Sequence, residues 1–288
     1  MKHYLSLIKF SHTVFALPFA LVGFFVGVSE QGIGLDWRLF FLVILCMVFA
    51  RSAAMAFNRW LDRDVDALNP RTRMREIPAG VISPKAALRF VVLSCGLFIA
   101  TTYFINSLCF YLSPIALAVV LGYSYTKRFT WLCHVVLGTG LALAPIGAYI
   151  AATGRFGWIS VLYGLAVLFW TAGFDIIYAL QDEEFDRENR LFSIPAYVGK
   201  ARALSISEWF HLGAAAFMVM AGGLMHQRLA EAHWLTWLGT AIFLVMLVYQ
   251  HRLVKPNDLS RVNMAFFTTN GIASLIFGSL TVLDLTIL

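Results

Sequence analysis

The stretch that decides the fold is "WRLFFLVILCMVFARSAAMAFNRWLDRDVD", residues 37 to 66. Its part up to Phe57 is largely apolar and long enough to cross a hydrocarbon core of about 30 Å as an α-helix. Charge then rises sharply, and Asn58, Asp62 and Asp66 follow at intervals of four residues. Residues four apart lie on one face of a helix. The stretch therefore predicts a membrane-spanning helix with a line of polar side chains where it leaves the membrane.

Apolar runs of similar length recur along the whole chain. Hydrophobic residues make up 60% of the sequence and charged residues 13%, and the mean hydropathy is +0.75, which excludes an ordinary soluble domain. No low-complexity linker separates the runs, so residues 1–288 are predicted to form a single membrane-embedded, all-α domain. We count nine candidate spans: residues 13–29, 37–57, 86–105, 108–125, 131–152, 158–178, 204–224, 234–249 and 264–283.

The distribution of Lys and Arg predicts the orientation of these spans. Eighteen of the 22 basic residues fall in segments on the same side as the N-terminus, including Lys2 and Lys9, and only Arg38, Arg155 and Arg228 fall on the other. Because basic loops stay inside, we expect the N-terminus and both long charged loops in the cytoplasm. The C-terminus is then outside, in an inner (cytoplasmic) membrane. Topology accounts for the net charge of +6, so no nucleic-acid partner is expected.

A second charged segment resembles the first. Tyr178, Asp182 and Asp186 repeat the four-residue spacing, and an Ile-Pro-Ala sequence follows at residues 194–196, as it does at residues 77–79. Both segments follow even-numbered spans and are expected on the same side of the membrane. The similarity suggests a parallel internal repeat of about four helices.

Each acidic segment is preceded by an ionisable residue within its apolar span. Arg51 lies seven residues before Asn58, and Asp175 lies seven residues before Asp182. Ionisable side chains inside a membrane usually face a polar cavity. We therefore expect each line of polar residues to continue into the membrane.

Two acidic clusters facing each other would repel unless cations neutralised them. Mg²⁺ binds few carboxylates per ion and completes its shell with water and phosphate oxygens. Basic residues at Arg71, Arg73, Arg75 and Lys127 would add direct phosphate contacts. The pattern predicts a diphosphate site at the cytoplasmic surface with an apolar cavity behind it.

Simpler roles for these charges stay open at this point. The loops could be charged only because they are hydrated, and Arg51 and Asp175 could each belong to an intramembrane ion pair that holds helices together. A transporter would place its site near the midplane of the bilayer, whereas these carboxylates concentrate at one end. A CDP-alcohol phosphotransferase would carry Asp-Gly-x2-Ala-Arg before its aspartates, and a non-enzymatic scaffold would not require a doubled acidic motif.

Four ordered stretches resemble the signatures of the UbiA superfamily of intramembrane aromatic prenyltransferases: "RSAAMAFNRWLDRDVD" (51–66), "RTRMREIPAG" (71–80), "YSYTKRFT" (123–130) and "FDIIYALQDEEFD" (174–186). The resemblance runs from "KFSHTVFALP" (9–18) to "VNMAFFTTNG" (262–271). It implies nine helices around a central cavity and Mg²⁺-dependent transfer of a polyprenyl group from polyprenyl diphosphate to an aromatic acid in quinone biosynthesis. The partners are then the lipid bilayer and these two substrates, and no obligatory protein partner is inferred.

The resemblance also implies roles for individual residues. Catalytic roles fall to Asp62, Asp66, Asp182, Asp186 and Asp175, the last near the acceptor pocket. The Mg²⁺ ligands would be Asn58, Asp62, Asp66, Asp182 and Asp186. Substrate-binding roles fall to Arg51, Asn58, Arg71, Arg75, Tyr123, Lys127 and Tyr178, with Arg51 left open between the acceptor carboxylate and a phosphate. His134 is expected to pack at a helix end and not to bind a metal.

Two departures leave the acceptor open. Arg59 stands where many 4-hydroxybenzoate enzymes have Asp, and Phe192 stands where many have a basic residue. The forms "REIPAG" and "HTVFALPFA" look closer to the branch that prenylates a futalosine-derived aromatic acid in menaquinone synthesis. The first prediction is a 4-hydroxybenzoate-type acceptor, and the alternative is the futalosine-derived acid.

Overall fold

The computed structural model describes residues 4, 7, 15–32 and 34–287. Within these ranges every regular element is a helix, and the β-structure is limited to an isolated bridge between Lys255 and Asp258. The predicted all-α class is therefore confirmed. The predicted start of the first span at Thr13, and the basic residues Lys2 and Lys9, lie outside the described residues.

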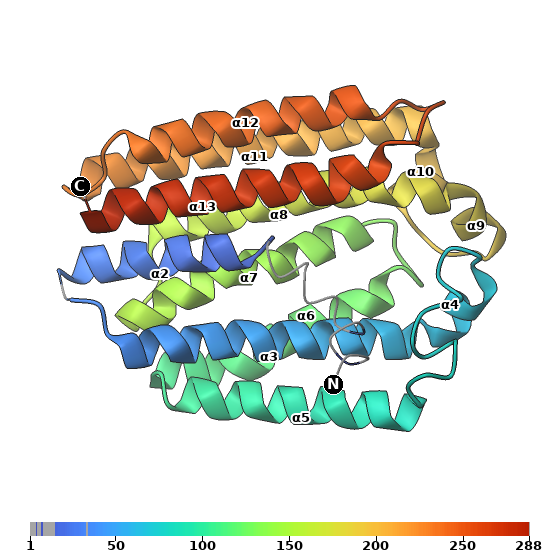
Figure 1. Ribbon diagram of the computed structural model, residues 1–288, viewed down its shortest axis with the longest axis horizontal. Helices are drawn as coiled ribbons and strands as arrows, with labels where there is room; N and C mark the ends of the chain where they lie inside the picture. Colours follow the sequence, from blue (N-terminus) through green and yellow to red (C-terminus); the bar gives the residue numbers. More distant parts are fainter. Residues whose placement is uncertain (1–3, 5–6, 8–14, 33, 288) are drawn as a thin grey trace. The chain divides into compact units, whose positions relative to one another are not determined.

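The helices form two compact units, labelled by helix in Figure 1. The first unit comprises residues 37–125 and the described residues of 1–13, and the second comprises the described residues of 14–36 and 126–288. The first holds α3 (Trp37–Leu61), α4 (Arg63–Leu68), α5 (Pro84–Tyr103) and α6 (Ser107–Thr126). The second holds α2 (Leu17–Gln31), α7 (Cys133–Thr153), α8 (Trp158–Ala179), η2 (Leu180–Asp182), α9 (Glu183–Glu188), α10 (Ile194–Val198), α11 (Lys200–Arg228), α12 (Leu235–Leu253), η3 (Met264–Thr268) and α13 (Thr269–Ile287).

This division differs from the two four-helix halves of the suggested repeat. The first unit holds the helices of only three predicted spans, because α2 belongs with α7 to α13 in the second unit. That the whole chain acts as a single membrane domain stays a prediction.

Seven helical segments of the described chain are long and apolar enough to cross a membrane. The helix α2 is shorter, at 15 residues, and α12 carries Gln250, His251 and Arg252 in its last turn. The predicted count of about nine spans is therefore not confirmed, although α2 and α12 correspond to the two remaining apolar runs. The seven segments are Trp37–Leu61, Pro84–Tyr103, Ser107–Thr126, Cys133–Thr153, Trp158–Glu188, Lys200–Arg228 and Met264–Ile287.

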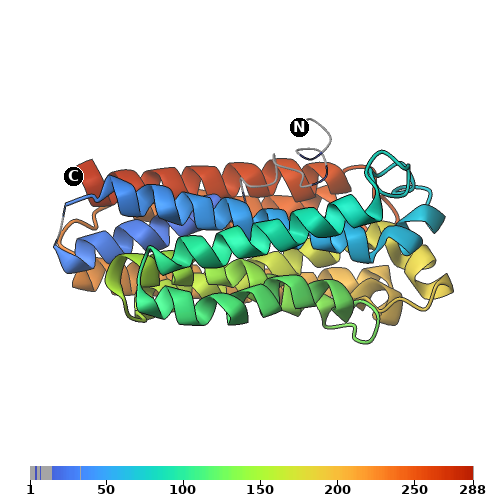
Figure 2. The same cartoon turned by 90° about the horizontal axis from the view of Figure 1, so that it is seen from below.

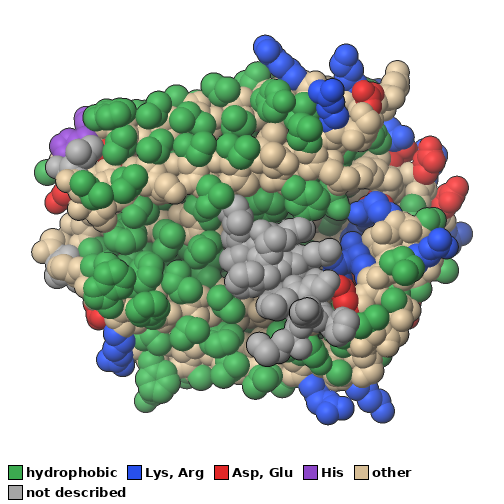
Figure 3. All heavy atoms as spheres, viewed as in Figure 1, with side chains coloured by type: hydrophobic (Ala, Val, Ile, Leu, Met, Phe, Trp, Pro, Cys, Tyr) green, Lys and Arg blue, Asp and Glu red, His purple; other side chains and the backbone are tan. Residues whose placement is uncertain are grey.

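The helix flanks carry the apolar surface of a membrane protein. Large side chains such as Tyr111 and Val245 are well exposed. In Figure 3 hydrophobic side chains cover much of the visible helix flanks, whereas Lys and Arg gather toward helix ends. Exposed apolar surface on this scale is unfavourable in water and favourable against lipid tails. The chain is an integral membrane protein.

In the first unit, packing of the loop after α4 positions basic side chains. The helices α3 and α5 pack together, and Ile77 and Ile82 of the loop join their buried cluster. Ser83 ends the loop by accepting a hydrogen bond from the backbone N–H of Ala86 at 3.3 Å. With Pro84 in the first helical turn, this is a favourable start for α5.

In the second unit, α8 is the central helix and packs against α7 and α11. A Cβ atom at Gly138 of α7 would lie 2.4 Å from the carbonyl oxygen of Leu168 in α8, so only glycine permits this close approach. On the other side of the unit, α12 packs against α11 and α13, and Figure 1 shows the three helices side by side. Figure 2 shows α13, in red, from the perpendicular direction. The contacts of α8 with α7 and α11 position the helix that leads into the second acidic motif.

Candidate active site

The first acidic motif lies at a break between two helices. The helix α3 ends at Leu61 and α4 begins at Arg63, and Asp62 between them has φ −89° and ψ 6°. Backbone hydrogen bonds still run from Asp62 to Asn58 at 2.9 Å and from Asp66 to Asp62 at 2.7 Å. The Asn58 amide Nδ2 donates to Asp62 Oδ2 at 3.0 Å. The helical spacing therefore survives the break, and Asn58 and Asp62 are in contact.

Asp66 is buried and paired with a cation. Nη1 of Arg75 donates to both of its carboxylate oxygens, at 2.6 and 2.8 Å. The hydroxyl of Thr72 donates to the backbone carbonyl of Asp66 at 3.1 Å, so the intervening loop is tied to α4. These charge-assisted bonds fix Arg75 beside the acidic motif.

The other predicted basic residues of the first unit have distinct surroundings. The backbone N–H of Arg71 donates to Asn69 Oδ1 at 2.9 Å, and the residue is exposed. Arg51 interacts electrostatically with Tyr123, as does Arg59. The structure therefore brings Arg51 and Tyr123 together and leaves Arg71 on the loop.

Arg59 is a buried cation whose importance the sequence motif did not reveal. It is only 6% exposed, and within the described part of the chain its Nε and Nη1 atoms have no hydrogen-bond partner. The negative charge of Asp66 attracts the Arg59 guanidinium, and the positive charge of Arg75 repels it. A buried guanidinium with unsatisfied donors is costly. The only signal in the sequence was that Arg replaces the commoner Asp beside Asn58.

The second acidic motif has the same local geometry as the first. The helix α8 ends at Ala179, η2 follows, and α9 begins at Glu183. Asp182 has φ −104° and ψ 5°, close to the angles of Asp62. Both first aspartates therefore lie in the sparsely populated region where many active-site residues are found. The Ile-Pro-Ala sequences differ, because the first lies in turns and the second begins α10.

Asp186 is fully buried and held from two sides. Nζ of Lys127 lies 2.7 Å from its Oδ1, and the hydroxyl of Ser193 donates to its Oδ2 at 3.0 Å. Burial alone would lower the pKa of Lys127, but the charges of Asp186 and Asp182 outweigh it and raise that pKa above its usual range. Lys127 is therefore a cation at neutral pH.

Asp175 is paired with a residue distant in the sequence. Nδ1 of His134 lies 2.7 Å from Asp175 Oδ2, and the backbone N–H of Ile194 donates to Nε2 of the same ring at 3.3 Å. Because Nε2 accepts, we infer that the proton is on Nδ1 and is donated to Asp175. His134 is buried, as expected, but it also has a polar role that the sequence did not indicate, since 41 residues separate the pair.

Tyr178 belongs to an aromatic cluster on the same helix. Its ring stacks on Phe266, with centroids 4.1 Å apart, and Phe174 contacts Phe266 edge to face at 5.3 Å. Phe266 lies in η3, a π-helical turn, and such turns are frequent at functional sites. The cluster places several aromatic faces on the part of α8 that carries Asp175.

The oxygen-rich side chains fit Mg²⁺ better than zinc. Among the described residues no group of three or more His, Cys, Asp or Glu side chains is placed to hold a metal ion. Mg²⁺ needs no such group, because one or two carboxylates suffice when water and substrate phosphates complete its shell. Since Asn58 Nδ2 donates to Asp62, its Oδ1 atom is left as an additional oxygen ligand.

Comparison with known proteins agrees with these features. The family model described as "UbiA prenyltransferase family" matches residues 16–272. The 4-hydroxybenzoate octaprenyltransferase of Aliivibrio fischeri (strain MJ11) is 30% identical over 244 residues, which cover 84% of this chain and 82% of that protein.

Solved structures show the same fold. The apo structure of a UbiA homologue from Aeropyrum pernix K1 matches with a TM-score of 0.84 and 31% identity, over 95% of this chain and 98% of that one. A UbiA homologue from Archaeoglobus fulgidus bound to DMAPP and Mg²⁺ matches with a TM-score of 0.74 and 20% identity, over 99% of both chains. With its two acidic helix breaks and a family match over most of its length, the chain belongs to the UbiA prenyltransferase family.

Proposed function

We propose that the protein transfers a polyprenyl group from polyprenyl diphosphate to a 4-hydroxybenzoate-type aromatic acid, with Mg²⁺, in quinone biosynthesis. The observation that carries this proposal is that each acidic motif pairs a buried aspartate with a cation, Asp66 with Arg75 and Asp186 with Lys127. Such cations can transfer from carboxylate to phosphate oxygens when a metal ion takes the carboxylates. The name of the Aliivibrio relative and the ligands of the Archaeoglobus homologue support the same chemistry.

Residues of both acidic motifs would bind the metal ion and the diphosphate. Bound Mg²⁺ would neutralise the diphosphate leaving group and so favour ionisation of the allylic C–O bond. Its proposed ligands are Asn58, Asp62, Asp66, Asp182 and Asp186. Arg75 and Lys127 would bind phosphate oxygens directly, and Arg71 and Tyr123 are proposed as further diphosphate contacts.

The acceptor side of the reaction would depend on Asp175. Its carboxylate, oriented by His134, would orient the aromatic acid or stabilise the positive charge that develops on the ring as it attacks the allylic cation. The ring carbon that forms the new bond then loses its proton, which restores the aromatic ring. The rings of Tyr178 and Phe266 would present π-faces that attract a cation. Arg51 would supply a positive charge for the acceptor carboxylate or for a phosphate.

Arg59 favours a second candidate acceptor. The buried guanidinium replaces the Asp found in many 4-hydroxybenzoate enzymes, and "REIPAG" also resembles the menaquinone branch. In this alternative the acceptor is a futalosine-derived aromatic acid. We propose for either acceptor that both acidic motifs lie at the cytoplasmic surface of an inner membrane.

The test is prenyl transfer in membranes that contain the expressed protein, a labelled prenyl diphosphate and each acceptor in turn. Asp62→Ala and Asp182→Ala should each lower turnover by about a hundredfold or more, the loss typical of a removed electrostatic contact. Asp64→Ala and Glu184→Ala are matched controls, because these exposed acids are neighbours of the motif residues. EDTA should abolish transfer and added Mg²⁺ should restore it.

The results also separate the competing functions. Near-normal turnover in both Asp62→Ala and Asp182→Ala would refute the proposed mechanism. If the labelled prenyl diphosphate is consumed but neither acceptor becomes labelled, the protein uses a different acceptor. Uptake of a solute without any labelled product would instead favour a transporter.

A further inference from the structure

A polar pocket of about 520 Å³ lies in the second unit, at the end away from the acidic motif. It forms where α2, α7 and α11 end and α8 begins. The helix α8 has 22 residues, so about 33 Å separate this pocket from the motif at the other end of α8. The pocket therefore takes no part in the proposed transfer reaction.

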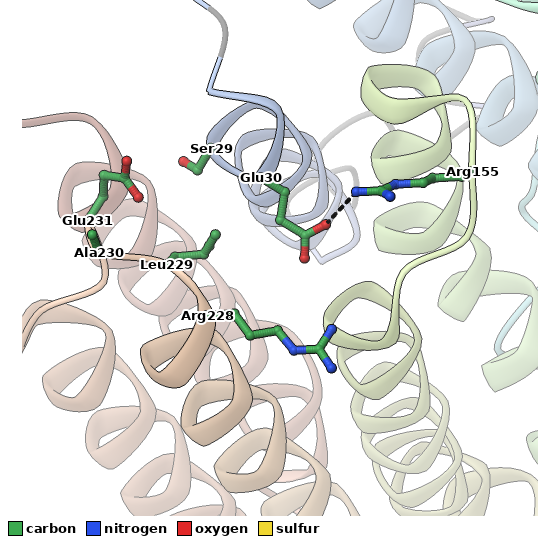
Figure 4. Close-up of a pocket in the computed structure, with 7 residues that line it drawn as sticks. All are labelled: Ser29, Glu30, Arg155, Arg228, Leu229, Ala230 and Glu231. Carbon is green, nitrogen blue, oxygen red and sulfur yellow. Dashed lines mark ion pairs between the residues drawn. The ribbon is translucent and has the colours of Figure 1, made fainter.

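Two guanidinium groups and two carboxylates line the pocket: Arg155 and Arg228, with Glu30 and Glu231. The Tyr149 hydroxyl donates to Glu30 Oε2, and Nη2 of Arg155 lies 3.7 Å from the same oxygen. Figure 4 shows the side chains of Arg155 and Arg228 extending toward the space around Glu30, whereas the carboxylate of Glu231 points away from them. The formal charges of the lining therefore balance, and Glu30 is the carboxylate that pairs with Arg155.

Arg228 is the side chain best placed for a ligand. Among the residues that the structure describes, it forms no ion pair and no side-chain hydrogen bond, although Glu30 lines the same pocket. Glu30 is already engaged by Tyr149 and Arg155. An anion in the pocket would use the planar donors of Arg228.

We infer from the surrounding helices that the pocket lies near the lipid headgroups. It is built at the ends of membrane-spanning helices, and the exposed aromatic residues Phe156, Trp158 and Trp234 follow its lining segments closely in sequence. Exposed Trp at helix ends is typical of the membrane interface. Arg155 and Arg228 are also two of the three basic residues that the topology prediction assigns to the outer side, where basic residues are depleted.

We propose that this pocket binds the phosphate group of an anionic phospholipid of the adjacent leaflet. Arg228 and Arg155 form charge-assisted hydrogen bonds to the phosphate oxygens. The acyl chains lie along the apolar helix flanks. This site is independent of prenyl transfer.

The test is native mass spectrometry of the purified full-length protein in detergent, titrated with phosphatidylglycerol. Arg228→Gln should raise the dissociation constant about tenfold, as expected for the loss of a hydrogen bond to a charged group. Arg38→Gln is the matched control, because it removes one exposed basic residue that lies outside the pocket, and it should leave binding unchanged. Arg228→Lys should retain part of the affinity.

Two further measurements decide the source of the phosphate. Diacylglycerol with the same acyl chains should bind the wild-type protein at least about tenfold more weakly than phosphatidylglycerol, since it lacks the phosphate. Competition by inorganic phosphate at equal concentration would overturn the lipid assignment and identify free phosphate as the ligand. Equal lipid binding by the wild-type protein and Arg228→Gln, with unchanged thermal unfolding, would overturn the proposal. Prenyl transfer by Arg228→Gln should match the wild type.

Discussion

Replacing Lys127 with Met removes the cation 2.7 Å from the fully buried carboxylate of Asp186. An uncompensated buried charge typically costs about 3–5 kcal/mol. The Lys127 side chain is 36% exposed and the bond from Ser193 persists, so we expect the lower end, about 3 kcal/mol. Thermal unfolding in detergent measures this loss.

The double variant Lys127→Met/Asp186→Asn tests the reason for the loss. It removes both charges and should recover most of the stability, because replacing a whole buried ion pair is often close to neutral. Lys85→Met is the control, since Lys85 is exposed and its loss should change stability by at most about 0.5 kcal/mol. A double variant as unstable as Lys127→Met, or a single variant as stable as the control, would refute the reasoning.

The same pair predicts how stability depends on pH. The pKa of Lys127 is raised above its ordinary value of 10.5, so the folded state binds this proton more tightly than the unfolded state. Its contribution to stability is then complete below pH 10.5 and is lost as the pH rises through the raised value. The difference in stability between the wild type and Lys127→Met should therefore stay constant from neutral pH and shrink only in strong alkali.

Three further substitutions follow from the contacts. His134→Phe removes the donor to Asp175. Because Asp175 then loses its orientation, kcat should fall about tenfold or more, whereas the KM for prenyl diphosphate should not change. A rise in that KM alone would contradict the acceptor-side role. Arg59→Gln removes a buried, partly unsatisfied guanidinium and should stabilise the substrate-free protein by about 1 kcal/mol, and a loss of stability would show that its donors are satisfied. Asp284 is fully buried and accepts hydrogen bonds from backbone N–H groups at the start of α12. Asp284→Ala should therefore lower the free energy of unfolding by about 2–3 kcal/mol, measured by thermal unfolding. The activity of the folded fraction should not change.

Properties that depend on neighbours along the chain could be predicted from the sequence alone. Long apolar runs identify membrane helices, because burying backbone polar groups in lipid requires a helix. The spacing of Asn58, Asp62 and Asp66 predicted a shared helix face, and the hydrogen bond between Asn58 and Asp62 agrees with it. The ends of spans were less predictable. The count of nine includes α2, which is apolar but only 15 residues long, and α12, whose last turn is polar. Seven helical segments of the described chain are long and apolar enough to cross a membrane.

The pairing of the charged groups depends on tertiary structure. His134 meets Asp175 only because α7 packs closely on α8, where Gly138 permits the approach. Lys127 meets Asp186 because the chain between α6 and α7 returns past α9, and Arg155 and Arg228 meet at one pocket because three helices end together. Composition and periodicity act over a few residues, so the sequence by itself determined the membrane class, the helices and the two acidic motifs. Which charge neutralises which carboxylate was decided only by packing between segments far apart in the chain, since a buried charge is stabilised by whatever partner the fold places beside it.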